Sequence, residues 1–241
     1  MNDDALIAPL TRDAINAPGP SNRPAQAADA AQEQVTRVYD RIAAGYDLFE
    51  SPMDWFGGTQ RRRRVLSAAR GRVLEVGIGT GRNLMCYPGS VKLTGIDASR
   101  QMLRRAQRQS IKLGVAADLK IADVQRLPFA NATFDTVTAT CVFCSVADPV
   151  RGLAEVRRVV KADGIVLLLE HVRPRNRLLG WLADQLTPLV RRLVGPEINR
   201  RTEENVAAAG LEITDLQVHG IWREIRARPG DAEPAGRDND E

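Results

Sequence analysis

Three acidic residues stand where each could bind one part of an extended polar ligand. Glu75, Asp97 and Asp123 each lie at or near the end of a short apolar segment that suits a buried parallel strand. Asp97 could accept hydrogen bonds from the two hydroxyls of a ribose, and Asp123 could accept them from the amino group of an adenine. An ordinary helix-capping acid is the alternative interpretation of Asp97.

Three alternating glycines follow the first of these acids. Gly77, Gly79 and Gly81 occur in VLEVGIGTGRN, directly after an apolar run. Glycine lets the backbone turn tightly after a strand and leaves room for a ligand to come close. The fingerprint of nicotinamide dinucleotides needs a glycine five residues after the first one, and that position is Arg82. The spacing therefore indicates a ligand other than a nicotinamide dinucleotide.

Strand-like and helix-like segments alternate around these residues, which indicates a parallel sheet with helices on both faces. The expected strands are Arg72–Val76, Val91–Ile96, Leu119–Ile121, Phe134–Thr140 and Ile165–Glu170. The expected helices are Arg82–Tyr87, Ser99–Gln109 and Pro149–Val160, with Ser99 and Asp148 as N-caps. After Gly210 two strands, 211–218 and 221–227, follow in succession, which suggests a hairpin with an antiparallel edge strand. The ligand crevice is expected at the carboxyl ends of the parallel strands.

The chain resembles the class I S-adenosylmethionine-dependent methyltransferases over roughly residues 33–227. Four segments carry the resemblance in the order of the family's motifs: LEVGIGTG, GIDASRQML, ADVQRLPFANATFDTV and EVRRVVKADGIVLLLEHV. The resemblance implies an α/β fold, a doubly wound, seven-stranded, mostly parallel sheet with an antiparallel C-terminal edge strand. It also implies an enzyme that uses S-adenosylmethionine as its cofactor.

The resemblance assigns cofactor-binding roles to individual residues. Glu75 and the glycine loop, Gly77–Gly81, would hold the amino acid end of S-adenosylmethionine, and Asp97 would hold its ribose. Met102 or Ala98 would pack near the adenine, while Asp123 and the backbone of Val124 would bind the edge of the base. In the N-terminal segment VYDRIAAGYD, Tyr39 and Tyr46 would close over the cofactor.

The methyl acceptor is less sharply indicated than the cofactor. The segments TCVFCSVADPVRGLAEVRRV, LLLEHVRP and NRRTEENVAAAGLEI are most similar to the branch that contains thiol methyltransferases and bacterial phospholipid N-methyltransferases. Thiol-methylating relatives often carry a Gly-Cys-His element where this chain has Gly195-Pro196-Glu197-Ile198. We expect a small apolar or lipid-like acceptor, either a thiol or a phospholipid amine. A quinone precursor or another C- or O-acceptor is an alternative, and a cofactor-binding interaction module without catalysis is an alternative of another class.

Histidine and cysteine could assist the acceptor. A free thiol is mostly protonated at neutral pH, so a nearby base would help, and His171 at the expected end of the fifth strand is the candidate catalytic residue. A purely structural histidine is the alternative. Cys141 and Cys144 have the spacing of a metal knuckle, but no second pair accompanies them, so no metal site is expected. Together with Cys86 they are expected to be buried small hydrophobic residues, with arsenic methylation as an outside alternative.

Composition indicates one soluble domain that could touch an anionic surface. The 241 residues are 44% hydrophobic, and the net charge of +4 comes almost entirely from arginine. This bias reflects either genome composition or contact with an anionic partner. The run Arg61–Arg64 is interpreted as a solvated helix face and not as a nucleic-acid site, because no aromatic residues are interleaved with it. The acidic start, the few cysteines and the lack of a long apolar stretch favour a cytoplasmic location, at most peripheral to the membrane.

The expected domain organisation is one methyltransferase domain over residues 31–228, between disordered tails at 1–30 and 229–241. Within it, residues 176–200 would form a helical insertion on the acceptor side. Leucines recur at helical spacing in 176–194, and Pro188 would break the helix near Thr187. We expect this segment, through Trp181 and its leucines, to cover the acceptor pocket while its arginines rest on an anionic membrane. A helix pair that only buries its apolar stripe on the domain is the alternative.

Overall fold

The computed structural model describes residues 23–46, 58–171, 185 and 201–231. Its helices are α1 (Arg23–Ile42), α3 (Thr59–Leu66), η4 (Leu84–Cys86), α4 (Arg100–Leu113), η5 (Val124–Arg126), α5 (Pro149–Val159) and α7 (Thr202–Ala208). Its strands are β1 (Arg72–Val76), β2 (Lys92–Asp97), β3 (Ala117–Ile121), β4 (Phe134–Thr140), β5 (Val160–His171), β6 (Leu211–His219) and β7 (Trp222–Pro229).

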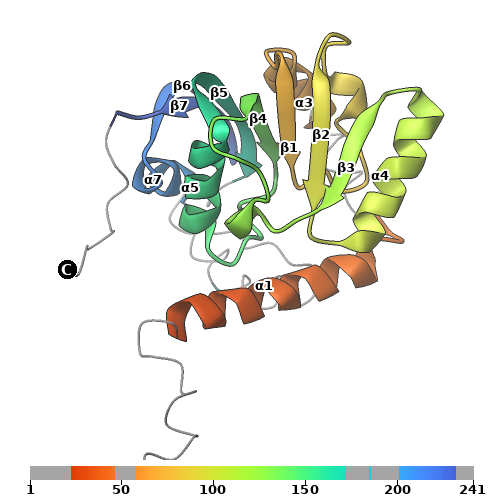
Figure 1. The fold of residues 1–241 in the computed structure, drawn as a ribbon, viewed down its shortest axis with the longest axis horizontal. Helices are drawn as coiled ribbons and strands as arrows, with labels where there is room; N and C mark the ends of the chain where they lie inside the picture. The colour runs from red at the N-terminus through yellow and green to blue at the C-terminus, as the bar shows by residue number, and fades with distance from the viewer. Residues whose placement is uncertain (1–22, 47–57, 172–184, 186–200, 232–241) are drawn as a thin grey trace, which may run out of the picture.

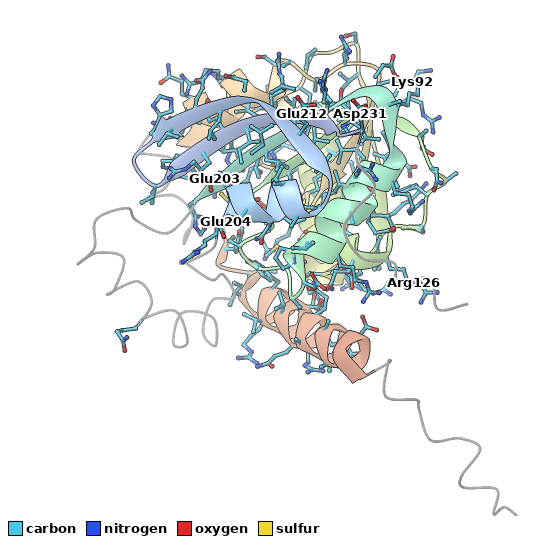
Figure 2. The ribbon with its side chains drawn as sticks, turned by 90° about the vertical axis from the view of Figure 1, so that its left-hand side faces the viewer. Lys92, Arg126, Glu203, Glu204, Glu212 and Asp231 are labelled. Atoms are coloured by element: carbon cyan, nitrogen blue, oxygen red, sulfur yellow. The ribbon has the colours of Figure 1, made fainter. Side chains whose placement is uncertain are left out.

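The strands form one seven-stranded sheet in the order β3-β2-β1-β4-β5-β7-β6. The first five strands pair in parallel, and β7 pairs antiparallel with both β5 and β6. The predicted α/β sheet with a C-terminal hairpin is therefore confirmed. The hairpin places β7 against β5 and leaves β6 at the edge, as the view onto this side of the molecule shows (Figure 2).

The two faces of the sheet bury separate hydrophobic clusters, because successive side chains of a strand point to opposite faces. Leu74 and Val76 of β1 pack in the cluster that contains α5 and α7, whereas Val73 packs in the cluster that contains α3 and α4. Helix α1 belongs to neither layer. It lies across one end of the sheet (Figure 1), at the carboxyl ends of the parallel strands.

Two predicted helix starts are confirmed, and one predicted helix is wrong. The side chains of Ser99 and Asp148 accept hydrogen bonds from backbone amides in the first turns of α4 and α5. The helix expected over Arg82–Tyr87 is only the 3-10 turn η4. Pro88 explains its early end, since the residue before a proline is driven to extended backbone and Tyr87 has ψ 147°.

Two predicted boundaries need comment. Helix α1 begins at Arg23, so the domain start expected at residue 31 lies inside a helix, and the domain bounds stay a prediction. The alanine-rich sequence with Pro24 in the first turn suits this helix. The segment 176–200 lies outside the described residues except for Gln185, so its helix, lid and membrane contact stay predictions. Among the described helices, none is long and apolar enough to cross a membrane.

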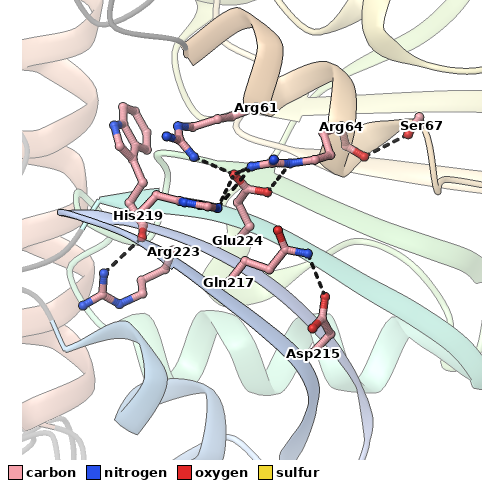
Figure 3. A network of polar contacts seen from close by, with 9 residues as sticks. Arg61, Arg64, Ser67, Asp215, Gln217, His219, Arg223 and Glu224 are labelled. Carbon is pink, nitrogen blue, oxygen red and sulfur yellow. Dashed lines mark hydrogen bonds and ion pairs between the residues drawn. The ribbon is translucent and has the colours of Figure 1, made fainter.

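Helix α3 is attached to β7 by a buried carboxylate. Glu224 is 5% exposed, and its side chain accepts hydrogen bonds from Arg61 (Nη1 to Oε1, 2.9 Å) and from Arg64 (Nε to Oε2, 2.8 Å). Figure 3 shows the carboxylate between the two guanidinium groups, with His219 beside them. Burial opposes ionisation of Glu224, but the hydrogen bonds from Arg64 and Arg61 prevail and hold its pKa below the usual range.

We predict that Glu224→Gln lowers the free energy of unfolding at neutral pH by about 1–3 kcal/mol, because it leaves two arginines without their anion. A carboxyl group with a lowered folded-state pKa stabilises the fold above its unfolded pKa, and this stability is lost as the pH falls through the folded value. The difference between variant and wild type should therefore shrink in acid. Urea unfolding at several pH values measures it.

Glu212→Gln is the matched control for this substitution. Glu212 also pairs with an arginine, Arg228, but both side chains are about half exposed. An exposed pair contributes roughly 0–1 kcal/mol. Equal losses of stability in the two variants would contradict the structural role of Glu224.

Candidate functional site

A cleft opens where β1, β2 and β4 end, and residues of α1 line its outer side. Figure 1 shows α1 across this end of the sheet. It encloses about 690 Å³ of empty space when its open mouth is included. Eight of the residues predicted from the sequence line it: Tyr39, Tyr46, Gly77, Gly79, Asp97, Ala98, Met102 and Val124. Residues separated by many positions in the sequence thus share one cavity.

The glycine turn after β1 forms the floor of the cleft. Gly77 and Gly79 have φ of +64° and +58°, in the left-handed region that favours glycine. A Cβ on Gly77 would lie 2.5 Å from Val142 Cγ2, so the turn packs against the loop after β4. A Cβ on Gly79 would meet nothing closer than the Gly77 carbonyl oxygen at 3.9 Å, which means that this position faces open space in the cleft. Gly81 does not line the cleft and instead packs on Leu84 and Ala106.

Asp97 is the acid that the structure places in the cleft. Its Oδ2 accepts a hydrogen bond from the Gly79 amide (2.9 Å), and its Oδ1 accepts one from the Ser99 amide (2.8 Å). Burial raises the pKa of Asp97 to about 6, although both amide hydrogen bonds favour the charged form. Each carboxylate oxygen has more than one lone pair, so Asp97 can accept further hydrogen bonds from a ligand.

Glu75 lies behind the floor and not on the lining. The Asn83 side-chain amide donates to its Oε1 at 2.6 Å, and Arg62 donates to the Asn83 Oδ1 at 3.2 Å. Both Asn83 and Arg62 also donate to the Thr140 hydroxyl, and Thr140 lines the cleft. Burial raises the pKa of Glu75 to about 7, against the hydrogen bond from Asn83 and the charge of Arg62. This buried polar cluster connects α3, β1 and β4 beneath the cleft.

The residues predicted to bind the adenine lie at and just after the ends of β2 and β3. Ala98, Met102 and Val124 line the main cleft there, and Asp123 lines an adjoining hollow that shares Ala98 with it. Asp123 Oδ1 accepts a hydrogen bond from the Gln125 amide (2.9 Å) and so begins η5. Asp123 is therefore beside the cleft but not on the same wall as Asp97.

Helix α1 is fixed over the cleft by polar contacts from its inner side. The Tyr39 hydroxyl is 2.6 Å from the Ser145 hydroxyl, and Gln32 Oε1 accepts the Ala147 amide at 3.1 Å. Further along, Asp40 Oδ1 accepts from the Ser99 hydroxyl at 2.5 Å. The rings of Tyr39 and Tyr46 meet edge to face with centroids 5.9 Å apart. Both predicted tyrosines thus stand at the wall that α1 provides.

The candidate catalytic histidine is not brought to the cleft lining. His171 ends β5 and packs edge to face on Trp222, with ring centroids 6.4 Å apart. Its neighbour Glu170 is fully buried and accepts hydrogen bonds from the amides of Val142 and Phe143, both at 3.0 Å. Glu170 therefore shapes the loop after β4, and a catalytic role for His171 stays a prediction.

Two of the three cysteines are buried, and the third lines the cleft. Cys86 and Cys144 are buried, while Cys141 is partly exposed and lines the cleft. Cys141 has φ of +56°, which is unusual for a residue with a side chain and places it in a tight turn directly after β4. Within the described part of the chain, no group of three or more His, Cys, Asp or Glu side chains is arranged to hold a metal ion.

Sequence reasoning missed several residues of this site. Gln32, Val35 and Thr36 precede the predicted Tyr39 at helical spacing along α1, and all of them line the cleft. That spacing could have been found in the sequence. Arg62 and Asn83 could not, because their partners lie far away in the chain.

Comparisons with known proteins agree with the geometry. Residues 74–168 match the model of a family described as a methyltransferase domain. A phosphatidylethanolamine N-methyltransferase of Cereibacter sphaeroides is 36% identical over 58% of this chain and 68% of its own length. The ubiquinone/menaquinone biosynthesis C-methyltransferase UbiE of Geotalea uraniireducens is 31% identical over 61% of this chain and 66% of its own length. The chain thus spans about two thirds of these relatives.

Solved structures show the same fold. A SAM-dependent methyltransferase from Methanosarcina mazei superimposes with a TM-score of 0.56 at 20% identity, covering 66% of this chain and 92% of that one. At this identity the likeness concerns the architecture of the sheet and its helices.

We predict that Gly79→Ala weakens the affinity for S-adenosylmethionine by about ten-fold or more, because the new Cβ enters the open space of the cleft. Gly114→Ala is the matched control. Gly114 ends α4 with φ +66° and also faces open space, so both variants bear the same backbone strain. The melting temperature should fall by a similar amount in both variants. Calorimetric titration should show weaker S-adenosylmethionine binding in Gly79→Ala only. Unchanged affinity in Gly79→Ala would remove the glycine turn from the cofactor site.

Proposed function

Because the chain belongs to the S-adenosylmethionine-dependent methyltransferases, we propose that it transfers the methyl group of this cofactor to a lipid-like acceptor, with a phospholipid amine favoured. The observation that carries the cofactor part is the partly buried Asp97 carboxylate beside the open floor at Gly79. The acceptor part is supported by the similarity to a phosphatidylethanolamine N-methyltransferase.

The residues of the cleft fit the cofactor in charge and in shape. Asp97 would accept the ribose hydroxyls, and the bare backbone at Gly79 would leave room for the amino acid end. Val124 and Asp123 would bind the adenine edge, while Ala98 and Met102 would pack on its ring. Glu75 would act from behind the floor, through Asn83 and Thr140. Tyr39 of α1 and Tyr46, four residues after the end of α1, would cover the cofactor.

The cofactor supplies an activated methyl group on a sulfonium sulfur. In the proposed reaction the acceptor nitrogen forms a bond to the methyl carbon as the carbon–sulfur bond breaks, and S-adenosylhomocysteine leaves. A primary ammonium group must lose its proton before it can attack, and an N–H proton leaves the product. Positioning and exclusion of water are therefore the main tasks of the protein.

The described walls of the cleft suit these tasks. Beyond the glycine turn they present Val142, Val146 and Cys141, which are apolar or weakly polar, and Tyr46 from the turn after α1. Asp97 is the one carboxylate among the described residues that line the main cleft, and the proposal assigns it to the ribose. This arrangement favours a dry site in which an acceptor is held close to the methyl group and gives its proton to solvent or to residues outside the described range.

A quinone precursor and a thiol are the two alternative acceptors. A quinone precursor is favoured by the similarity to UbiE, which is a C-methyltransferase. A thiol acceptor stays a prediction from the sequence, as does a binding module without catalysis. We further propose a cytoplasmic protein that meets its acceptor at a membrane surface and does not bind nucleic acid.

We predict that the affinity for S-adenosylmethionine rises with pH through about 6 as Asp97 ionises, since only the carboxylate accepts bonds from both hydroxyls. Glu75 titrates higher, at about 7, and should add a second step. Asp97→Asn should weaken binding by about ten-fold to a hundred-fold and abolish the lower step alone. Titration calorimetry from pH 5 to 8 measures both. A lower step that persists in Asp97→Asn would show that another group causes it.

The acceptor is tested by measuring formation of S-adenosylhomocysteine. We expect the fastest turnover with phosphatidylethanolamine in mixed micelles, slower turnover with a demethylated quinone precursor, and the slowest with a small alkyl thiol. Fastest turnover with the quinone precursor would replace the favoured acceptor. Cofactor binding without turnover on any of the three would favour the binding module.

A further inference from the structure

Helix α4 carries an outer surface made of cations. Arg100, Arg104, Arg108 and Lys112 recur every four residues, so they lie along one side of the helix, and all four are exposed. The opposite side is buried against the sheet through Met102, Leu103, Ala106 and Ser110. With the partly exposed Arg105, the helix has five basic residues and no acidic residue.

These cations are not used inside the described molecule. Among the described residues, none of the five basic side chains of α4 takes part in an ion pair. Arginines on other helices have such partners, as Arg158 has Glu155 and Arg64 has Glu224. The charge on α4 therefore faces solvent without compensation from its neighbours.

On the other face of the sheet, basic and acidic side chains of the helices are equal in number. Its helices α5 and α7 contain three arginines and three glutamates. Figure 2 shows two of these acids, Glu203 and Glu204, on α7. The positive charge of the described helices is thus concentrated on the face that holds α3 and α4, where Arg63 adds an exposed cation.

The same face exposes the two most accessible large apolar side chains of the described residues. Ile111 is 72% exposed and lies on the outer side of α4, between the positions of Arg104, Arg108 and Lys112. Met85 is 62% exposed on η4, which packs between α3 and α4 and turns Leu84 inward to the core. A cluster of basic residues on one side of an amphipathic helix is a pattern that binds anionic lipids, and two exposed apolar side chains accompany it here.

We propose that the α4 face, defined as Arg100, Arg104, Arg108, Lys112, Ile111 and Met85, docks on the surface of an anionic lipid bilayer. The cations attract acidic headgroups, and Ile111 and Met85 enter the boundary between headgroups and acyl chains. Nucleic acid fits this face less well, because α3, η4 and α4 contain no aromatic residue on which a base could stack.

Docking through α4 brings the cofactor cleft close to the lipid. The helix begins at Ser99, which lines the cleft, and Asp40 of α1 holds this end through the Ser99 hydroxyl and the Gln101 amide. The amino end of the α4 face therefore adjoins the rim of the cleft. The inference concerns where the protein docks and holds for any acceptor that resides in a membrane.

The test compares two triple variants of the full chain that lose the same charge. Arg104→Gln/Arg108→Gln/Lys112→Gln removes cations of the α4 face, and glutamine keeps the helix propensity. Lys92→Gln/Arg126→Gln/Arg226→Gln removes three exposed cations elsewhere. Sedimentation with phosphatidylglycerol vesicles at low salt should show the first variant bound roughly 100-fold more weakly than wild type, and the second bound within a few-fold of it. Ile111→Ser should weaken binding with the charge intact.

Three results would overturn the proposal. These are equal binding of both triple variants, no binding of wild type to phosphatidylglycerol vesicles, and equal binding to vesicles of neutral phosphatidylcholine. Stronger retention on single-stranded DNA than on vesicles would also overturn it, in favour of a nucleic-acid surface. S-adenosylmethionine affinity and melting temperature report folding in each variant, so a failure of docking is distinguishable from a failure of the proposed enzyme activity.

Discussion

The hydrogen bond from the Gly79 amide to Asp97 joins the turn after β1 to the end of β2, and the cleft depends on it. The turn can present this amide because Gly79 adopts positive φ, and the carboxylate lies within reach because β1 and β2 pair in parallel register. In the protein without a ligand, burial of the charged Asp97 carboxylate lowers the stability by on the order of 2–3 kcal/mol, as its pKa of about 6 indicates. Hydroxyl groups of a bound ligand would offset part of that cost, so the site is built for a ligand at some expense of stability.

The cleft is assembled from three layers that are fixed separately. The sheet sets the spacing of the strand ends, the polar cluster of Arg62, Asn83 and Thr140 anchors α3 beneath the floor, and α1 forms the outer wall through Tyr39. The strands beneath the floor belong to the two hydrophobic cores, whereas the buried Val35 and Val38 of α1 belong to neither of them. Local opening is easiest where few buried contacts are lost. A cofactor that enters under α1 therefore needs to displace one helix and leaves the sheet intact.

The sequence was sufficient for elements that local rules determine. The β1 strand, the caps Ser99 and Asp148 and the glycine turn each follow from short patterns, and eight predicted residues meet in the cleft as a consequence of strand order. Side-chain contacts between residues far apart in the chain could not be predicted from the sequence. In the sequence Arg62 is one of four consecutive arginines, but in the structure it alone of the four is buried. It is buried because the fold places its partners Asn83 and Thr140 beside it. His171 stands at the expected strand end, but strand position does not fix where a ring packs, and it lies on Trp222.

Some basic side chains of this chain bind acidic or polar groups of the fold, and others have no such partner among the described residues. The sequence alone does not distinguish the two groups. Arg61 and Arg64 are committed to Glu224, and Arg62 to the polar cluster, so most of the basic run before β1 serves the fold. The arginines of α4 look alike in composition but have no such partners among the described residues. A surface of uncompensated cations repels itself and costs some stability, and it becomes favourable against an anionic partner. The position of α4 at the rim of the cleft then links the charge of the surface to access of an acceptor from a lipid layer.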